Sequence, residues 1–92
     1  MAKPDVFKTA KGEKTEYVFI ESKKMTHFAL PNRRGFDSAV SFWEGPRGSS
    51  MNYPVVFDDH TMSDGRVLEK IAYEDVPAAI KAKHTKWKRL QG

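Results

Sequence analysis

The 92-residue chain has room for one domain with one modest core, because a chain this short buries only about two-thirds of the surface that its unfolded form exposes. Its 39% hydrophobic and 30% charged residues are typical of a globular protein and exclude global disorder, and the absence of cysteine excludes disulfides, thiolate metal sites and cysteine nucleophiles. Sixteen basic and twelve acidic residues leave a net charge of +4, which favours a polyanionic partner without requiring one.

The N-terminal residues are expected to form a flexible basic arm. Residues 1–14 are rich in lysine and include Gly12, and within them Val6 and Phe7 could add a short edge strand. A single globular domain is then predicted over residues 15–92. Ordered structure is expected to begin where that domain begins.

The middle of the chain has the apolar alternation of β-strands, interrupted by turn residues. The predicted strands are residues 15–21, 25–30, 38–43, 54–58 and 66–73. The first of them, TEYVFIE, is apolar on both faces, which predicts a central strand, and the second, MTHFAL, is its expected antiparallel partner. Residues 44–54 contain two glycines, two prolines and two serines, a composition that predicts an irregular loop.

An amphipathic helix is predicted to end the chain. After Tyr73 the spacing of apolar residues changes from two to 3.6, which predicts a helix over residues 76–90. Asp75 is the expected N-cap, Pro77 lies in the first turn, and Trp87 is expected to anchor the helix to the sheet. The helix carries five cations, most of them away from the apolar stripe: Lys81, Lys83, Lys86, Lys88 and Arg89.

These elements predict an α+β fold that is mainly β. We expect a small five-stranded antiparallel SH3-like or OB-like barrel, or a curled sheet, with a C-terminal amphipathic helix; an open sheet packed on the helix is the main alternative. The stretch VVFDDHTMSDGRVLEKIAYEDVPAAIKAKHTKWK resembles the C-terminal half of the small archaeal chromatin proteins with an SH3-type barrel. The resemblance rests on hydrophobic spacing around Asp75 and Pro77, and none of that family's DNA-binding residues carries over to this sequence.

The first functional expectation is a non-enzymatic nucleic-acid-binding module with weak sequence specificity, acting on DNA or RNA. Aromatic rings that stack on bases contribute roughly 1–3 kcal/mol each, and cations pair with phosphates. RGFDSAVSF is similar to the first ribonucleoprotein motif of RNA-recognition domains, but it follows VFI too closely for the helix and strand that such a domain needs between them. The expected binding residues are Arg33, Arg34, Trp43, Arg47, Lys81, Lys86, Lys88 and Arg89.

The alternative is a protein-binding accessory or inhibitory module that acts on a larger macromolecular machine. Its contact patch would be the 44–54 loop, with Trp43, Met51 and Tyr53 as anchors. Aromatic residues and methionine are enriched at protein interfaces, and the mobile loop that the composition predicts would present them to a partner.

The sequence offers little that points to catalysis. It has no nucleophile elbow and no phosphate-binding glycine loop, and the contiguous Asp58, Asp59 and His60 do not have metal-ligand spacing. We therefore expect no enzyme, no cofactor, no metal and no small-molecule substrate. Apolar runs are far shorter than the roughly 20 residues of a membrane span, and no secretory signal is visible, so a cytoplasmic location without membrane contact is expected.

Overall fold

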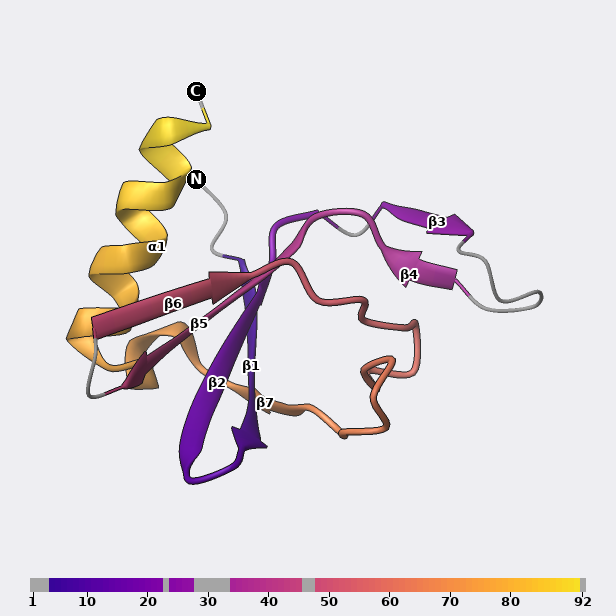
Figure 1. Cartoon of the computed structure of the whole chain (residues 1–92). Helices are drawn as coiled ribbons and strands as arrows, with labels where there is room; N and C mark the ends of the chain where they lie inside the picture. The colour runs from indigo at the N-terminus through magenta and orange to yellow at the C-terminus, as the bar shows by residue number, and fades with distance from the viewer. Residues whose placement is uncertain (1–3, 23, 28–33, 46–47, 92) are drawn as a thin grey trace.

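A five-stranded antiparallel sheet and one helix form the fold, which the computed structural model describes over residues 4–22, 24–27, 34–45 and 48–91 (Figure 1). The sheet has the order β6-β5-β2-β1-β7, and two short strands, β3 and β4, pair with each other. The strands are β1 (Asp5–Lys11), β2 (Lys14–Ile20), β3 (Met25–His27), β4 (Arg34–Phe36), β5 (Ala39–Gly45), β6 (Gly48–Asn52) and β7 (Glu69–Ile71). The 3-10 turn η1 (Tyr73–Asp75) precedes helix α1 (Ala78–Leu90). The predicted mainly β fold with a C-terminal helix is confirmed.

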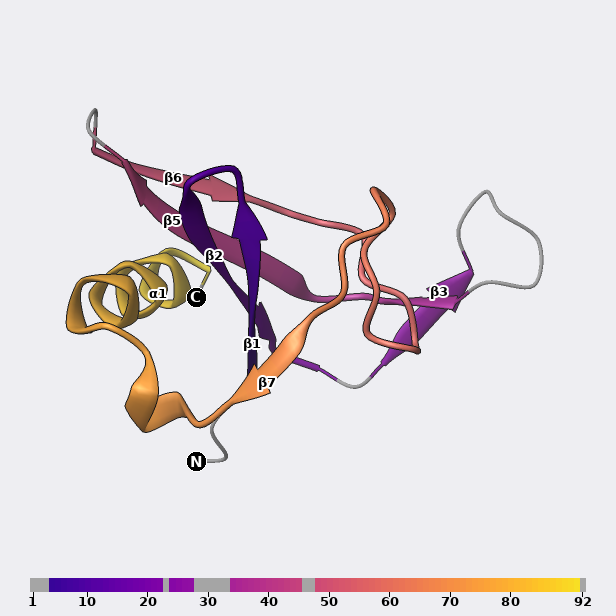
Figure 2. The ribbon, with the colours of Figure 1, turned by 90° about the horizontal axis from the view of Figure 1, so that it is seen from below.

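The sheet is curled and open. Its two edges are β6 and β7, which do not pair with each other in the described part of the chain, so the strands do not close into a barrel (Figure 2). β2 lies in the middle of the five strands, as its two apolar faces predicted. The curled sheet, rather than the SH3-like or OB-like barrel, is therefore the form that this sequence adopts.

Alternation along the strands divides the core into two clusters, one on each face of the sheet. On one face Val6, Phe19, Val40 and Phe42 pack against Val76 and Ile80, so α1 covers this face. The opposite face is covered by β4 and the segment that follows β6. Its buried residues are Phe7, Val18, Ile20, Phe36, Ala39, Val56, Met62 and Leu68. Because successive side chains of a strand point to opposite faces, the three inner strands β5, β2 and β1 each contribute to both clusters.

The expectation of a flexible arm over residues 1–14 is wrong for residues 5–11, which form β1. β1 pairs with β2 along its whole length and also with β7, and Val6 and Phe7 are buried. Gly12 has a φ of 62°, which a two-residue hairpin turn between Lys11 and Lys14 accommodates without strain. A local hairpin therefore supplies the partner of β2 that the prediction sought in residues 25–30.

Four other predicted segments differ from the structure. Only Met25–His27 of the 25–30 segment is described as a strand, and it pairs with β4. The 44–54 segment, expected to be an irregular loop, contains β6, which pairs with β5. The predicted strands 54–58 and 66–73 shrink to isolated bridges and to the three residues of β7, because most of this part of the chain crosses the sheet face and only β7 lies along an edge.

The predicted C-terminal helix is confirmed, but it begins at Ala78 and not at residue 76. Asp75 is not its N-cap, because Asp75 belongs to η1, where the amide of Val76 donates a hydrogen bond to the carbonyl of Tyr73. Pro77 takes the cap position, and no side chain caps the helix. Among the described residues no helix has the length and apolar character that a bilayer crossing requires.

Candidate functional site

The predicted nucleic-acid-binding residues that the structure describes do not form one surface. The helix cations belong to α1, whereas Arg34 lies on β4, and both views place these elements at opposite ends of the molecule (Figures 1 and 2). Arg33 and Arg47 lie outside the described residues. The structure therefore separates Arg34 from the cations with which it was expected to act.

Trp43 is also separated from the helix cations. On β5, Phe42 points to the face that α1 covers, and Trp43, the next residue, points to the opposite face. Trp43 is half-buried, and the Nζ of Lys11 lies 4.2 Å from its ring centroid, so the ring already has a cation as its neighbour. The partial exposure expected of Trp43 is present, but the predicted cationic helix does not accompany it.

Two of the four predicted helix cations have partners within the fold. Lys88 donates a hydrogen bond to a carboxylate oxygen of Glu21 over 2.9 Å, and the Nζ of Lys81 lies 5.5 Å from the ring centroid of Tyr73. Lys86 and Arg89 are exposed and pair with no carboxylate among the residues that the structure describes. The cations that remain available to a partner therefore lie toward the C-terminal end of α1.

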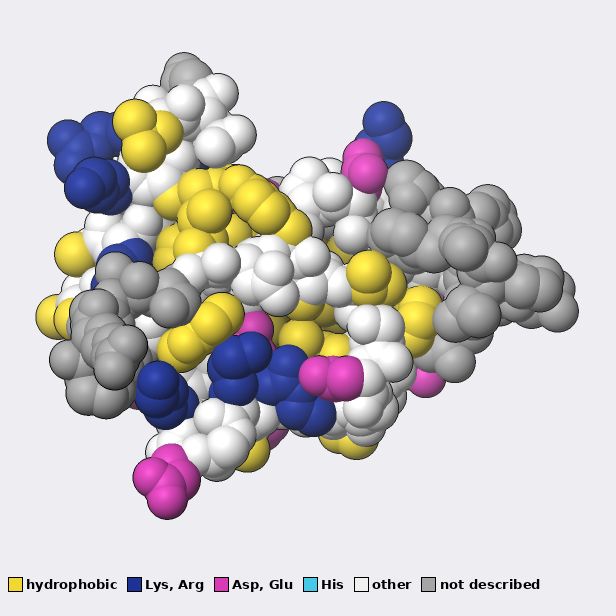
Figure 3. Space-filling view, in the orientation of Figure 1, with side chains coloured by type: hydrophobic (Ala, Val, Ile, Leu, Met, Phe, Trp, Pro, Cys, Tyr) yellow, Lys and Arg dark blue, Asp and Glu magenta, His cyan; other side chains and the backbone are white. Residues whose placement is uncertain are grey.

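Exposed apolar side chains gather beside this end of α1. Met51 on β6, Tyr53 just after it and Leu90 on α1 are 46%, 58% and 76% exposed. Figure 3 shows apolar surface between α1 and β6, with lysine and arginine side chains along its outer border. Met51 and Tyr53, two of the three residues predicted as protein-binding anchors, thus lie together, and Trp43 is absent from this patch because it points to the other face.

Two adjoining hollows define the site, and we call them together the α1 groove. They have volumes of about 540 and 300 Å³ and share Tyr53, Trp87 and Gln91. The larger hollow runs toward the end of β2 and the start of β5. The smaller one lies between β6 and α1 and is lined by Phe42, Met51, Tyr53, Lys83, Lys86, Trp87, Leu90 and Gln91. The smaller hollow therefore combines apolar side chains with two lysines, whereas the larger one is also lined by the acidic residues Glu21 and Asp37.

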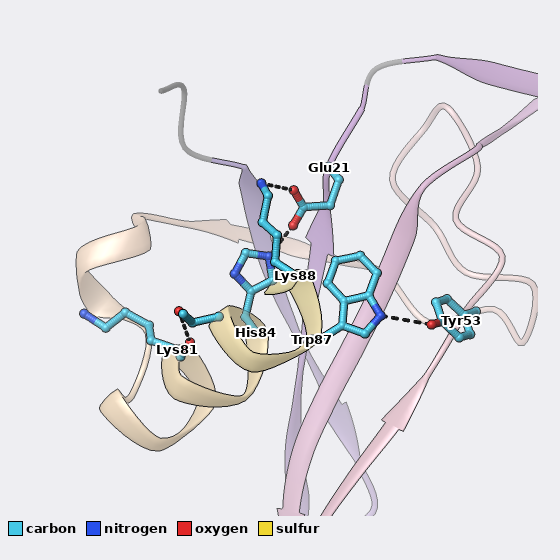
Figure 4. A network of polar contacts seen from close by, with 7 residues as sticks. Glu21, Tyr53, Lys81, His84, Trp87 and Lys88 are labelled. Atoms are coloured by element: carbon cyan, nitrogen blue, oxygen red, sulfur yellow. Dashed lines mark hydrogen bonds and ion pairs between the residues drawn. The ribbon is translucent and has the colours of Figure 1, made fainter. Parts of the chain in front are cut away.

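A hydrogen bond between two aromatic residues forms the ridge of the groove. The indole Nε1 of Trp87 donates to the hydroxyl of Tyr53 over 2.9 Å, which joins α1 to the segment after β6 (Figure 4). Trp87 is partly buried against the core, so the role predicted for it, anchoring the helix, is confirmed, and it also forms part of the groove. Sequence reasoning missed Trp87 and Leu90 as surface residues, although their i, i+3 spacing places them along one side of the helix.

A buried polar network holds this part of α1 in place. His84 is buried, and its ring stacks on Phe19 with a centroid distance of 4.2 Å and an interplanar angle of 6°. Its Nε2 contacts one carboxylate oxygen of Glu21, and Lys88 donates to the other oxygen (Figure 4). Glu21 follows β2, so the network attaches the C-terminal half of α1 to the central strand and thereby positions Trp87.

The network lowers the pKa of Glu21. Burial acts to raise the pKa of this carboxyl, but hydrogen bonds and charge from His84 and Lys88 outweigh burial and bring it below its ordinary value of 4.5. A carboxylate whose pKa is lower in the folded than in the unfolded state stabilises the fold above the unfolded pKa. That contribution is lost as the pH falls through the folded pKa.

We therefore expect Glu21→Gln to lower the free energy of unfolding at about pH 5.5, and the difference from the native chain to shrink as the pH falls to about 3. Urea unfolding at a series of pH values in this range measures the difference. A difference that stays constant across the range would contradict the assignment of this carboxylate to the network.

Comparisons with known proteins yield no family model, no curated protein and no solved structure that matches the chain. Within the described ranges no group of three or more histidine, aspartate or glutamate side chains is placed to hold a metal ion. The chemistry of the α1 groove is the basis on which a function can be inferred.

Proposed function

We propose that this chain is a protein-binding module, and that its α1 groove holds a segment of a partner protein that is apolar in part and acidic in part. The observation that carries the proposal is the grouping of Met51, Tyr53 and Leu90, all substantially exposed, around the partly buried Trp87. Exposed apolar groups that adjoin one another beside a hollow are typical of sites that bury a partner's side chains.

The charges around the groove favour an acidic partner. Lys86 lines the smaller hollow and Arg89 is exposed on the same helix, and neither pairs with a carboxylate among the described residues. Charge complementarity of this kind steers association and selects among partners more than it adds affinity. Apolar contacts in the groove would supply the affinity, and Lys86 and Arg89 would select segments that carry aspartate or glutamate.

Several features make a protein partner a better fit than a nucleic acid. Bases stack on flat, accessible rings, but the rings of Tyr53 and Trp87 are tilted by 55° and joined by their own hydrogen bond. Met51 and Leu90 are aliphatic and offer no stacking surface. Arg34, an expected phosphate contact, does not line this groove. Nucleic-acid binding stays a prediction, which the titration described below tests.

Selection from a library of random peptides displayed on phage tests the proposal. We expect the native chain to enrich peptides that combine apolar with acidic residues. Leu90→Ser should weaken binding of the selected peptides by about 1.5–3 kcal/mol, or at least about tenfold, because a leucine side chain no longer becomes buried on binding. The matched control is Val67→Ser, which removes a side chain that is 70% exposed but lies outside the groove, and binding should not change.

Failure to enrich such peptides would contradict the proposal. Titration of the protein with labelled single- and double-stranded DNA and RNA at about 50 mM salt tests the nucleic-acid prediction. If these polymers bind, and Lys86→Gln with Arg89→Gln abolishes the binding while no peptide is enriched, the nucleic-acid prediction replaces the protein-binding proposal.

A further inference from the structure

The two edges of the sheet have different character. β7 is only three residues long, and its Glu69 and Lys70 lie 3.8 Å from Lys8 and Asp5 of the neighbouring strand. Short strands with charged residues are the usual protection of a sheet edge against further pairing. β6 has five residues, GSSMN, with no charge and no proline, so the sequence gives this edge none of that protection.

The outer side of β6 is unpaired in the described part of the chain. β6 pairs with β5 from Gly48 to Asn52 and is the last strand in the order of the sheet. Figures 1 and 2 show no described segment beyond it. In an antiparallel strand alternate residues direct their N–H and C=O groups away from the existing partner, so β6 presents a row of donors and acceptors that another strand can use.

The α1 groove lies directly beside this edge. Met51 of β6 is paired with Phe42 of β5, and both line the smaller hollow together with Lys83, Lys86 and Leu90 of α1. A strand added to β6 would send every second side chain toward the face that α1 covers, at intervals of about 7 Å. Those side chains would enter the hollow next to Met51 and under the exposed Leu90.

We propose that the partner segment binds as an added strand on β6, with alternate apolar side chains in the α1 groove and acidic side chains facing Lys86. This inference rests on the proposed function and specifies how the segment binds. Backbone pairing on a free edge, combined with pockets for alternate side chains, is an established way for a protein to recognise an extended peptide.

Charge favours a different protein over a second copy of this chain as the occupant. Pairing β6 with β6 of another copy would bring two sets of groove lysines, including the exposed Lys86, to the same junction. Both copies also carry a net charge of +4. An acidic segment would meet these cations with opposite charge, whereas a second copy would add repulsion.

Backbone N-methylation of a peptide obtained from the display selection tests this binding mode. N-methylation removes one N–H donor at a time, so residues whose N–H faces β6 should each lose about tenfold in affinity and the residues between them should lose little. In the complex, amide hydrogen exchange at Gly48–Asn52 should slow on the outward-facing positions. A period of two in the affinities together with slower exchange supports the added strand.

The possible outcomes separate this inference from the function on which it rests. If a peptide binds in a manner sensitive to Leu90→Ser but shows no alternation and leaves the β6 amides unprotected, the groove is used by another conformation and only the strand addition is overturned. If no peptide binds, both proposals fail. If the chain alone sediments as a dimer in which β6 is already protected, a second copy occupies the edge and the inference is likewise overturned.

Discussion

Replacing Phe19 by alanine is expected to lower the free energy of unfolding by about 3–5 kcal/mol, the range for truncating a fully buried aromatic residue. Phe19 has no exposed surface and lies in the central strand, beneath α1. Its ring centroid is 4.2, 5.7 and 6.5 Å from those of His84, Phe42 and Tyr73. The substitution therefore opens a cavity at the point where β2, β5, η1 and α1 meet.

Urea unfolding followed by tryptophan fluorescence and by circular dichroism measures this loss. Phe19→Leu is the matched control, because it keeps most of the buried volume, and we expect it to lose clearly less stability than alanine does. A loss below about 1 kcal/mol for Phe19→Ala would contradict the position assigned to this residue. Because His84 stacks on Phe19, partial repacking should also loosen Trp87 and weaken peptide binding.

Replacing Arg66 by methionine is expected to lower the free energy of unfolding by about 3 kcal/mol, because it leaves a buried carboxylate without its counter-charge. Glu16 of β2 has no exposed side-chain surface, and the Nη1 of Arg66 lies 2.7 Å from its Oε1. Within the described residues neither oxygen of Glu16 accepts a hydrogen bond of normal geometry, so its charge is balanced by this guanidinium. Arg66 is itself a quarter exposed, which places the effect at the lower end of the range for buried pairs.

The same arginine provides its own control. Its Nε also donates to Asp64 over 2.8 Å, but that carboxylate is 53% exposed. Asp64→Asn should therefore cost at most about 1 kcal/mol, since exposed ion pairs contribute little. The double substitution Glu16→Gln and Arg66→Met should recover part of the loss of Arg66→Met alone. Equal effects of Arg66→Met and Asp64→Asn in urea unfolding would contradict the view that burial decides the energy of this pair.

The sequence does not indicate that Glu16 and Arg66 form an ion pair. Alternation puts Glu16 on the same buried face of β2 as Val18 and Ile20. Burial of a carboxylate on this face is unfavourable unless a cation pairs with it. The partner lies fifty residues further along, in the segment that crosses the sheet face, and it also donates to the carbonyl of Ala10. No local pattern indicates that these two residues meet.

The errors in the predicted strands have a common cause. Periodicity shows that a segment can be a strand but not with which strand it pairs, and the nearest segment that fits is chosen. For β2 residues 25–30 were chosen because residues 1–14 were expected to be a flexible arm, whereas the tight hairpin at Gly12 pairs β2 with β1. For β6 the sequence GSSMN is polar and rich in small residues, and only its pairing with β5 makes it a strand.

The candidate site, too, could be predicted only in part from the sequence. Lys86, Met51 and Tyr53 were recognised from residue type and predicted exposure, and they lie together in the α1 groove. Trp43 and Arg34 were grouped with the helix cations because sequence composition carries no information about which face or which end of a fold a residue occupies. The groove needs both β6 and α1, so it could not be found in either segment alone.

Local patterns in this sequence determined the type of its most regular elements, since the alternation of TEYVFIE and the 3.6-residue spacing after Tyr73 depend only on side chains near one another in the chain. Tertiary structure alone decided which strands pair, which face of the sheet α1 covers and that Trp87 meets Tyr53 beside an open edge. These outcomes depend on burying apolar surface between residues far apart in the chain, and the free energy of that burial is a property of the whole fold.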